Sequence, residues 1–226
     1  MATSKINWPE AMLPLIKKYK GRKFPLEYHD VYELVVMVVL AAQSTDAQVN
    51  KVAPGFFAGY PDIAALAKAT PDMLFPYLAG IRNFAHKASW LVGMAQKTKT
   101  NKGIPLTLEE LVELPGIGRK SANVILRESG KPPEGVIVDL HVVRVAPRLG
   151  IAKEEDPKKI EETLMKILPK EEWEAGMAMS FLGREICRPT PECPICLMNK
   201  VCAYYLRSQK AKKPLPAVKK SKRAIK

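Results

Sequence analysis

The stretch LPGIGRKSANVIL, residues 114–126, places Gly116 and Gly118 two positions apart and then begins an apolar run with helical spacing. Because glycine adopts left-handed backbone without strain, this pair predicts a tight turn. Upstream, Thr107 followed by Glu110 has the pattern of a capping box, which predicts a helix that ends at the turn. The stretch therefore predicts two helices joined by a glycine hairpin.

A hairpin of this kind is suited to hold a nucleic-acid phosphate. Its glycines let the backbone approach closely, and the free N–H groups at the start of the second helix point toward the anion. Contacts to phosphate position a protein on DNA without reading the bases. We therefore take Gly116, Gly118 and the basic Arg119 as candidate DNA contacts.

Lys120 follows the hairpin directly and is a candidate nucleophile. The positive end of the helix dipole and partial burial both lower the pKa of an ammonium group there, which favours the reactive neutral amine. A lysine that only contacts phosphate is the alternative.

Asp139, in the segment VDLHVVRV, is either a helix N-cap or a carboxylate that faces Lys120, and the two roles are compatible. His141 follows on the same predicted helix; a structural role is the commoner one for such a histidine, and we also include it among the candidate DNA contacts.

The fold class predicted from the rest of the chain is all-α, with short loops between packed helices. Asp62 is a predicted helix cap, and GVIVD, residues 135–139, is the one segment that also reads as a strand. Apolar residues recur at helical spacing in 31–42, 62–67, 73–78, 84–95, 107–114, 120–127, 140–149, 158–168 and 172–186.

The charge of the chain points to a polyanionic partner. The 226 residues carry a formal charge of +13 and 47% hydrophobic residues. Residues 207–226 hold nine Lys or Arg and no acid, so the remainder carries +4. We predict a disordered tail there, which either aids solubility or adds attraction to phosphate.

The apolar run at 31–42 is too short to cross a bilayer, and the N-terminus lacks a secretory pattern, so we expect a cytoplasmic protein without a membrane partner.

Four cysteines lie close together with the spacing C-x5-C-x2-C-x5-C. This pattern predicts a metal site with four thiolates and no open coordination position. A [4Fe–4S] cluster is the favoured occupant, because only one Cys-x-x-Cys pair is present, and zinc is the alternative. The four ligands are Cys187, Cys193, Cys196 and Cys202.

The hairpin, the VDLHVVRV segment and the cysteine loop, in this order and spacing, resemble the endonuclease III family of helix-hairpin-helix DNA glycosylases and lyases. The segment LAAQSTDAQVN, residues 40–50, matches a further signature of that family. The resemblance extends from about residue 10 to residue 206. It implies two helical domains on either side of a DNA cleft: a six-helix domain with the hairpin, 24–134, and an iron–sulfur domain formed by 1–23 and 135–206.

The resemblance also implies a chemistry. A base-excision repair enzyme of this family removes oxidised pyrimidines from double-stranded DNA and cleaves the strand by β-elimination. Lys120 matches the family's catalytic lysine, which forms a Schiff base, and Asp139 matches its catalytic aspartate. Gln43 would fill the gap left by the flipped base, and Ile81 or Phe84 would wedge the opposite strand. We expect a monomer located at the nucleoid.

Three departures from the family pattern affect these expectations. The first cysteine gap has five residues where the family commonly has six, which tightens the loop. Leu140 follows the aspartate where the family usually has threonine. Arg82 stands where the family's wedge loop usually has glycine.

Three other functions compete with the bifunctional enzyme. An adenine-mismatch glycosylase of the same superfamily lacks the lysine and carries a further C-terminal domain, neither of which fits this chain. A lyase that acts mainly at abasic sites is compatible with the altered wedge loop. A DNA-binding module without catalysis would need neither Lys120 nor Asp139.

Overall fold

The computed structural model describes residues 6–132 and 134–212, which form α-helices, short 3₁₀ turns and loops, with no β-strand in these two ranges. The all-α prediction is confirmed. The α-helices are α1 (Trp8–Tyr19), α2 (Val31–Ala41), α3 (Asp46–Gly59), α4 (Ile63–Ala67), α5 (Pro71–Leu74), α6 (Phe84–Thr98), α7 (Leu108–Val112), α8 (Arg119–Glu128), α9 (Leu140–Leu149), α10 (Pro157–Ile167), α11 (Ala175–Glu185) and α12 (Ala203–Lys212).

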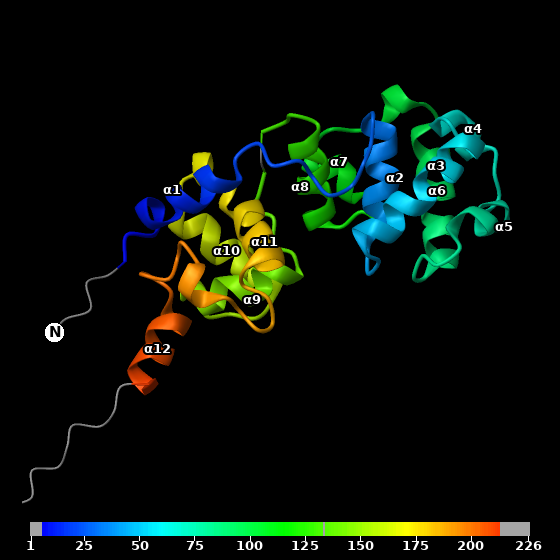
Figure 1. The fold of residues 1–226 in the computed structure, drawn as a ribbon. Helices are drawn as coiled ribbons and strands as arrows, with labels where there is room; N and C mark the ends of the chain where they lie inside the picture. The colour runs from blue at the N-terminus through cyan, green and yellow to red at the C-terminus, as the bar shows by residue number, and fades with distance from the viewer. Residues whose placement is uncertain (1–5, 133, 213–226) are drawn as a thin grey trace, which may run out of the picture.

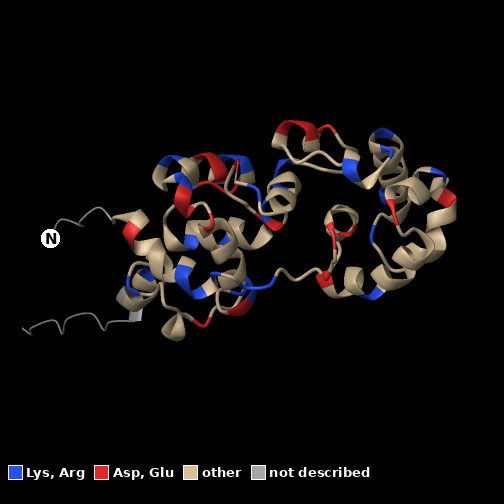
Figure 2. Cartoon of the chain, turned by 90° about the horizontal axis from the view of Figure 1, so that it is seen from above, with Lys and Arg blue, Asp and Glu red and all other residues tan. Residues whose placement is uncertain are grey.

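The helices gather in two groups (Figure 1). One group contains α2 to α8, and the other contains α1 with α9 to α12. The chain passes between them twice, once between α1 and α2 and once between α8 and α9. Figure 2 shows Lys and Arg positions, coloured blue on the ribbon, in both groups, so the basic residues are not confined to one element. The domain boundaries at residues 24 and 134 stay a prediction.

Helix α2 forms the centre of the first group. Its residues from Leu34 to Leu40 are all buried, so the helix is covered on every side. An apolar helix that is surrounded by others explains the long hydrophobic run without a membrane. Within the described residues, no helix is long and apolar enough to cross a bilayer.

Two predicted helix starts are confirmed by their capping hydrogen bonds. Asp62 accepts from the backbone N–H of Ala65 at 2.7 Å. Thr107 accepts from the N–H of Glu110 at 3.3 Å, and its hydroxyl donates to the Glu110 carboxylate at 2.7 Å. These short side chains satisfy backbone donors that the first turn of a helix leaves free.

Three helices escaped the sequence analysis. Helices α1 and α3 contain Pro14 and Pro54 in their interiors, which interrupt the pattern by which a helix is recognised. Helix α12 runs to Lys212, so the prediction of a disordered tail is wrong for 207–212, and residues 213–226 lie outside the described range. The segment 135–139 pairs with no strand in the described structure; its apolar side chains are buried where the chain enters the second group.

Candidate active site

Lys120 and Asp139 line one pocket of about 280 Å³ where the two groups of helices meet. The pocket also receives residues from the end of α2, the start of α3, and α11. Lys120 is the second residue of α8, and Asp139 precedes α9. Two residues from different helix starts are thus brought together in a single site.

The hairpin before Lys120 has the geometry that its glycines predict. Gly116 adopts a left-handed conformation with φ of +80°. A Cβ atom at this position would lie 2.8 Å from the indole ring of Trp90, on α6. Gly118 has an ordinary φ and open space around it, so its backbone is accessible from outside. Gly116 is therefore required by the turn itself, whereas Gly118 leaves room for a ligand.

The pKa of Lys120 is lowered, as predicted. Desolvation by the surrounding protein is the main cause, and Arg184 acts in the same direction. Asp139 and Asp46 oppose it, because their negative charges favour the ammonium form. The side chain is nevertheless exposed, because it lies within a pocket that is open to solvent. Such an amine is both accessible and easier to deprotonate than a surface lysine.

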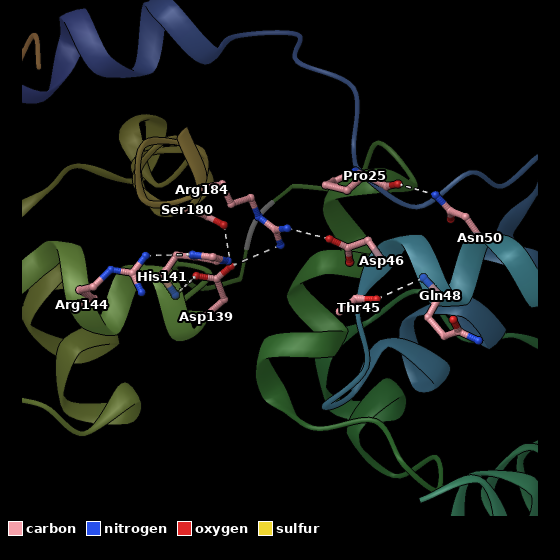
Figure 3. A network of polar contacts seen from close by, with 10 residues as sticks. All are labelled: Pro25, Thr45, Asp46, Gln48, Asn50, Asp139, His141, Arg144, Ser180 and Arg184. Carbon is pink, nitrogen blue, oxygen red and sulfur yellow. Dashed lines mark hydrogen bonds and ion pairs between the residues drawn. The ribbon is translucent and has the colours of Figure 1, made fainter. Parts of the chain in front are cut away.

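Asp139 is held rigidly by both of its carboxylate oxygens (Figure 3). Oδ1 accepts from the backbone N–H groups of His141 at 2.9 Å and Val142 at 3.0 Å, which makes Asp139 the N-cap of α9. Oδ2 accepts from the hydroxyl of Ser180, on α11, at 2.5 Å. The capping role and a place in the pocket coexist, as the sequence indicated.

Arg184 lies between two carboxylates across the pocket (Figure 3). Its guanidinium donates to Asp46, at the start of α3, at 2.6 Å. The same group lies 3.9 Å from Asp139. Arg184 belongs to α11 and Asp46 to the other group of helices, so this ion pair joins the two groups beside Lys120.

The cysteine loop is attached to the helix that Asp139 caps. Arg144, on α9, lies 3.2 Å from the Nδ1 atom of His141 and donates to the backbone carbonyl of Cys187 at 2.9 Å. Arg148, one turn further along α9, donates to the carbonyls of Arg188 at 2.7 Å and Pro189 at 3.0 Å. The position of the loop is therefore coupled to the position of α9.

All four predicted metal ligands line one small pocket and are free thiols. Burial is the main cause that raises the pKa values of Cys193 and Cys196, and neighbouring cysteines add to it. Over the described ranges, no group of three or more His, Cys, Asp or Glu side chains has the geometry of a site for a single metal ion. The donor set itself, four converging thiols, fits an iron–sulfur cluster.

Comparison with known proteins agrees with this geometry. Residues 36–170 match the family model of the HhH-GPD superfamily base excision DNA repair proteins. Endonuclease III of Synechocystis is 37% identical over 206 residues, which cover 89% of this chain and 94% of that protein. Endonuclease III of Thermotoga maritima is 33% identical, with 84% and 91% covered.

The chain belongs to the endonuclease III family. Among solved structures, a trapped endonuclease III–DNA covalent intermediate has a TM-score of 0.79 at 32% identity and covers 88% of this chain and 96% of its own. A thermostable thymine-DNA glycosylase, 22% identical with a TM-score of 0.73, shares the fold.

Two of the residues expected to contact DNA are engaged with the protein itself. Arg119 donates from Nε to both carboxylate oxygens of Glu161 at 3.0 Å and from Nη2 to the carbonyl of Glu134 at 3.1 Å. Its guanidinium links α8 to α10, although the side chain is 44% exposed. Ile81 is only 2% exposed, so it has no side-chain surface for DNA. Phe84, at 40% exposed, is the accessible member of the predicted wedge pair.

The remaining expected residues are accessible. Gln43 is exposed, with a left-handed φ of 57°, and His141 lines the pocket, where burial lowers its pKa. Leu140 is 70% exposed and also lines the pocket, so the substitution for the family's threonine places an apolar side chain beside Asp139.

Sequence reasoning missed Ser180, Arg184 and Asp46. Ser180 and Arg184 are four residues apart within the predicted helix 172–186 and therefore share a face. That spacing of polar residues in an otherwise apolar helix was the available signal. Asp46 lies in the family segment 40–50 but was not distinguished from its neighbours.

Proposed function

We propose that this endonuclease III family member removes oxidised pyrimidines from double-stranded DNA and then cleaves the strand, with Lys120 as the nucleophile. A DNA glycosylase with lyase activity is what membership of the family implies. One observation carries the assignment of residues. Lys120, with a lowered pKa, shares a pocket with a doubly anchored Asp139. DNA as the substrate places the protein at the nucleoid.

The chemistry begins with a nucleotide that has left the base stack. The neutral amine of Lys120 attacks C1′ of the sugar, the bond from C1′ to the base breaks, and the base leaves with its electron pair and gains a proton. The nitrogen loses a proton, and its lone pair then forms the C1′=N bond of an iminium ion as the C1′–O4′ bond breaks and O4′ takes up a proton, which opens the sugar. Loss of the C2′ proton then expels the 3′ phosphate oxygen, which breaks the strand by β-elimination.

Asp139 contributes negative charge at the developing cation. Backbone amides fix one of its oxygens and Ser180 fixes the other, so the carboxylate does not have to reorganise during the reaction. It also accepts the proton that the attacking nitrogen releases. Both roles require a carboxylate held close to C1′.

Duplex DNA would be gripped and opened by other accessible groups. The backbone at Gly116 and Gly118 would hold a phosphate beside the damaged nucleotide. Gln43 would occupy the space that the base leaves, and Phe84 would contact the opposite strand. Their support is the exposure of Gln43 and Phe84 and the open surroundings of Gly118.

A [4Fe–4S] cluster held by the four cysteines would fix the loop after α11. All four thiolates are occupied when the cluster is bound, so it offers no open position to a substrate. Arg144 and Arg148 connect this loop to α9 and hence to Asp139. Zinc is the alternative occupant, and iron, sulfide and zinc analysis of the purified protein distinguishes the two.

The test is covalent trapping with sodium borohydride. One duplex carries an abasic site and a matched one carries thymine glycol. We expect a stable adduct on both, and none with Lys120→Ala, which should retain DNA binding. Asp139→Asn should slow base release by about 10²-fold, because electrostatic and acid–base assistance are lost together. An adduct that persists in Lys120→Ala would refute the assignment of the nucleophile.

A lyase that acts mainly at abasic sites is the second candidate. The exposed Leu140 favours it, because an apolar side chain replaces a hydroxyl in the pocket that would receive the base. An adduct on the abasic duplex alone would select this function over the removal of thymine glycol.

A further inference from the structure

Lys87, on α6, is a buried lysine that the proposed chemistry does not use. It is 1% exposed, and the described structure gives it no ion pair with a carboxylate. Its Nζ atom donates to the backbone carbonyl of Leu40 at 2.7 Å and to the hydroxyl of Ser44 at 3.1 Å. Burial lowers its pKa to about 8. A buried ammonium without a counter-ion is costly, so its retention calls for an explanation.

Lys87 bonds the end of α2 and the turn that follows it, and Ser44 in that turn also bonds the loop before α6. Both the turn and the loop carry an unusual backbone conformation. Gln43, in the turn between α2 and α3, has a φ of 57°, and Asn83, just before α6, has a φ of 55°. For residues other than glycine, such conformations cost about 1 to 3 kcal/mol and persist only when surrounding contacts impose them. Only one other non-glycine residue in the described ranges, Lys99, has a positive φ.

Hydrogen bonds join these two loops through Ser44. Its hydroxyl accepts from the Lys87 ammonium at 3.1 Å and from the backbone N–H of Arg82 at 3.2 Å. The Asn83 amide reaches the side-chain oxygen of Gln43 at 3.5 Å. Lys87 therefore bonds the carbonyl of Leu40 at the C-terminal end of α2. It also fixes the hydroxyl of Ser44, which in turn holds the loop at Arg82.

We infer that Lys87 is a positioning residue, which holds the Gln43 turn and the Arg82–Phe84 loop together in the conformation that enters duplex DNA. The inference rests on the proposed function, because that function assigns these loops to the space of the flipped base and to the opposite strand. Filling the space of a flipped base and contacting the opposite strand are both possible only when the DNA is a duplex. Lys87 then acts on opening of the duplex and not on the amine chemistry at Lys120.

The experiment compares one abasic site in a duplex with the same site in a single strand, under single turnover. Lys87→Met removes both hydrogen bonds with a side chain of similar length. Loss of two buried, charge-assisted bonds predicts a fall of about tenfold or more in duplex cleavage. Cleavage of the single strand should change by less than about twofold. Fluorescence of 2-aminopurine beside the site, which rises as the duplex opens, should rise less with the variant.

Ser44→Ala keeps the lysine and removes the hydroxyl that links the loops. Like Lys87→Met, it should lower the ratio of duplex to single-strand cleavage. If Lys87→Met does not fold, Ser44→Ala is the variant that tests the inference. Lys97→Met is the matched control, since Lys97 is on the same helix and also donates to a helix-end carbonyl, that of Glu113, at 2.9 Å, but is exposed. We expect the ratio of duplex to single-strand cleavage in Lys97→Met to equal that of the wild-type protein.

An unchanged ratio in both Lys87→Met and Ser44→Ala would overturn the inference, as would an equal loss on both substrates in Ser44→Ala. Failure of the proposed function looks different. In that case the wild-type protein itself forms no borohydride adduct on either substrate, whatever Lys87 does.

Discussion

At the scale of single residues, the reactivity of Lys120 depends on the charges that surround it. Burial lowers its pKa, and the two aspartates of the pocket raise it. Arg184 lies between those aspartates, 2.6 Å from Asp46 and 3.9 Å from Asp139, and offsets their effect. Arg184 thus opposes the two carboxylates, which raise the pKa of the amine.

This arrangement predicts opposite shifts in the pH dependence of adduct formation. The rate should rise with pH as Lys120 loses its proton. Asp46→Asn removes a negative charge, so the pKa of Lys120 falls and the midpoint of the rise moves to lower pH. Arg184→Gln removes a positive charge, so the midpoint moves to higher pH. Single-turnover trapping between about pH 5 and 10 measures both. Shifts of the same sign would show that the charges do not act on Lys120 in this way.

Residues in local motifs were predictable, whereas those defined by contacts through space were not. Lys120 and Asp139 follow a hairpin and precede a helix, and both features are visible in a short segment. Ser180 joins the site only because α11 packs on α9. The ion pair of Arg119 with Glu161, 42 residues away, could not be predicted, because nothing near Arg119 in the sequence reveals that partner.

At the scale of elements, the two glycines of the hairpin have different structural roles. Gly116 has a positive φ and a close indole neighbour, whereas Gly118 has neither. The first glycine serves the conformation of the turn, and the second is free to admit a phosphate.

Alanine substitutions should therefore have different effects at the two positions. Gly116→Ala should lower the free energy of unfolding by about 1 to 3 kcal/mol, because of backbone strain and the contact with Trp90, and should weaken DNA binding as a consequence. Gly118→Ala should leave thermal stability unchanged and still weaken binding. Thermal unfolding and DNA titration of each variant measure the two effects. Normal DNA affinity in a stable Gly118→Ala protein would contradict a phosphate contact at this turn.

Helix boundaries were predictable where a cap or an apolar stripe marked them. Asp62 and Thr107 cap as expected, because a short polar side chain acts on its own first turn. Helix α3 was missed because Pro54 lies inside it, and tertiary packing of Val49, Ala53 and Phe56 compensates for the interrupted pattern.

At the scale of the whole molecule, ion pairs connect the two groups of helices at both ends of α8. Arg119 pairs with Glu161 on α10, and Arg127 pairs with Glu174, which immediately precedes α11, at 2.9 Å. Helix α8, which carries Lys120 and follows the hairpin, is thereby fixed to the group that carries Asp139. The glycine turn before Lys120 and the pocket that Lys120 and Asp139 line are therefore parts of one connected unit.

The basic C-terminal segment should add long-range attraction to this unit. Residues 213–226 contain six Lys or Arg and no acid, and removing them leaves α12 intact up to Lys212. Each phosphate contact contributes about 0.9 to the steepness of the plot of log affinity against log salt concentration. If all six basic residues contact phosphate, the slope for the truncated protein should be shallower by about 5. Its affinity should fall most at low salt, while adduct formation at saturating DNA stays unchanged. DNA titrations between about 50 and 200 mM salt measure the slope. A variant with the six basic residues replaced by glutamine separates charge from length: equal slopes in this variant and the wild-type protein would mean that the segment does not contact phosphate.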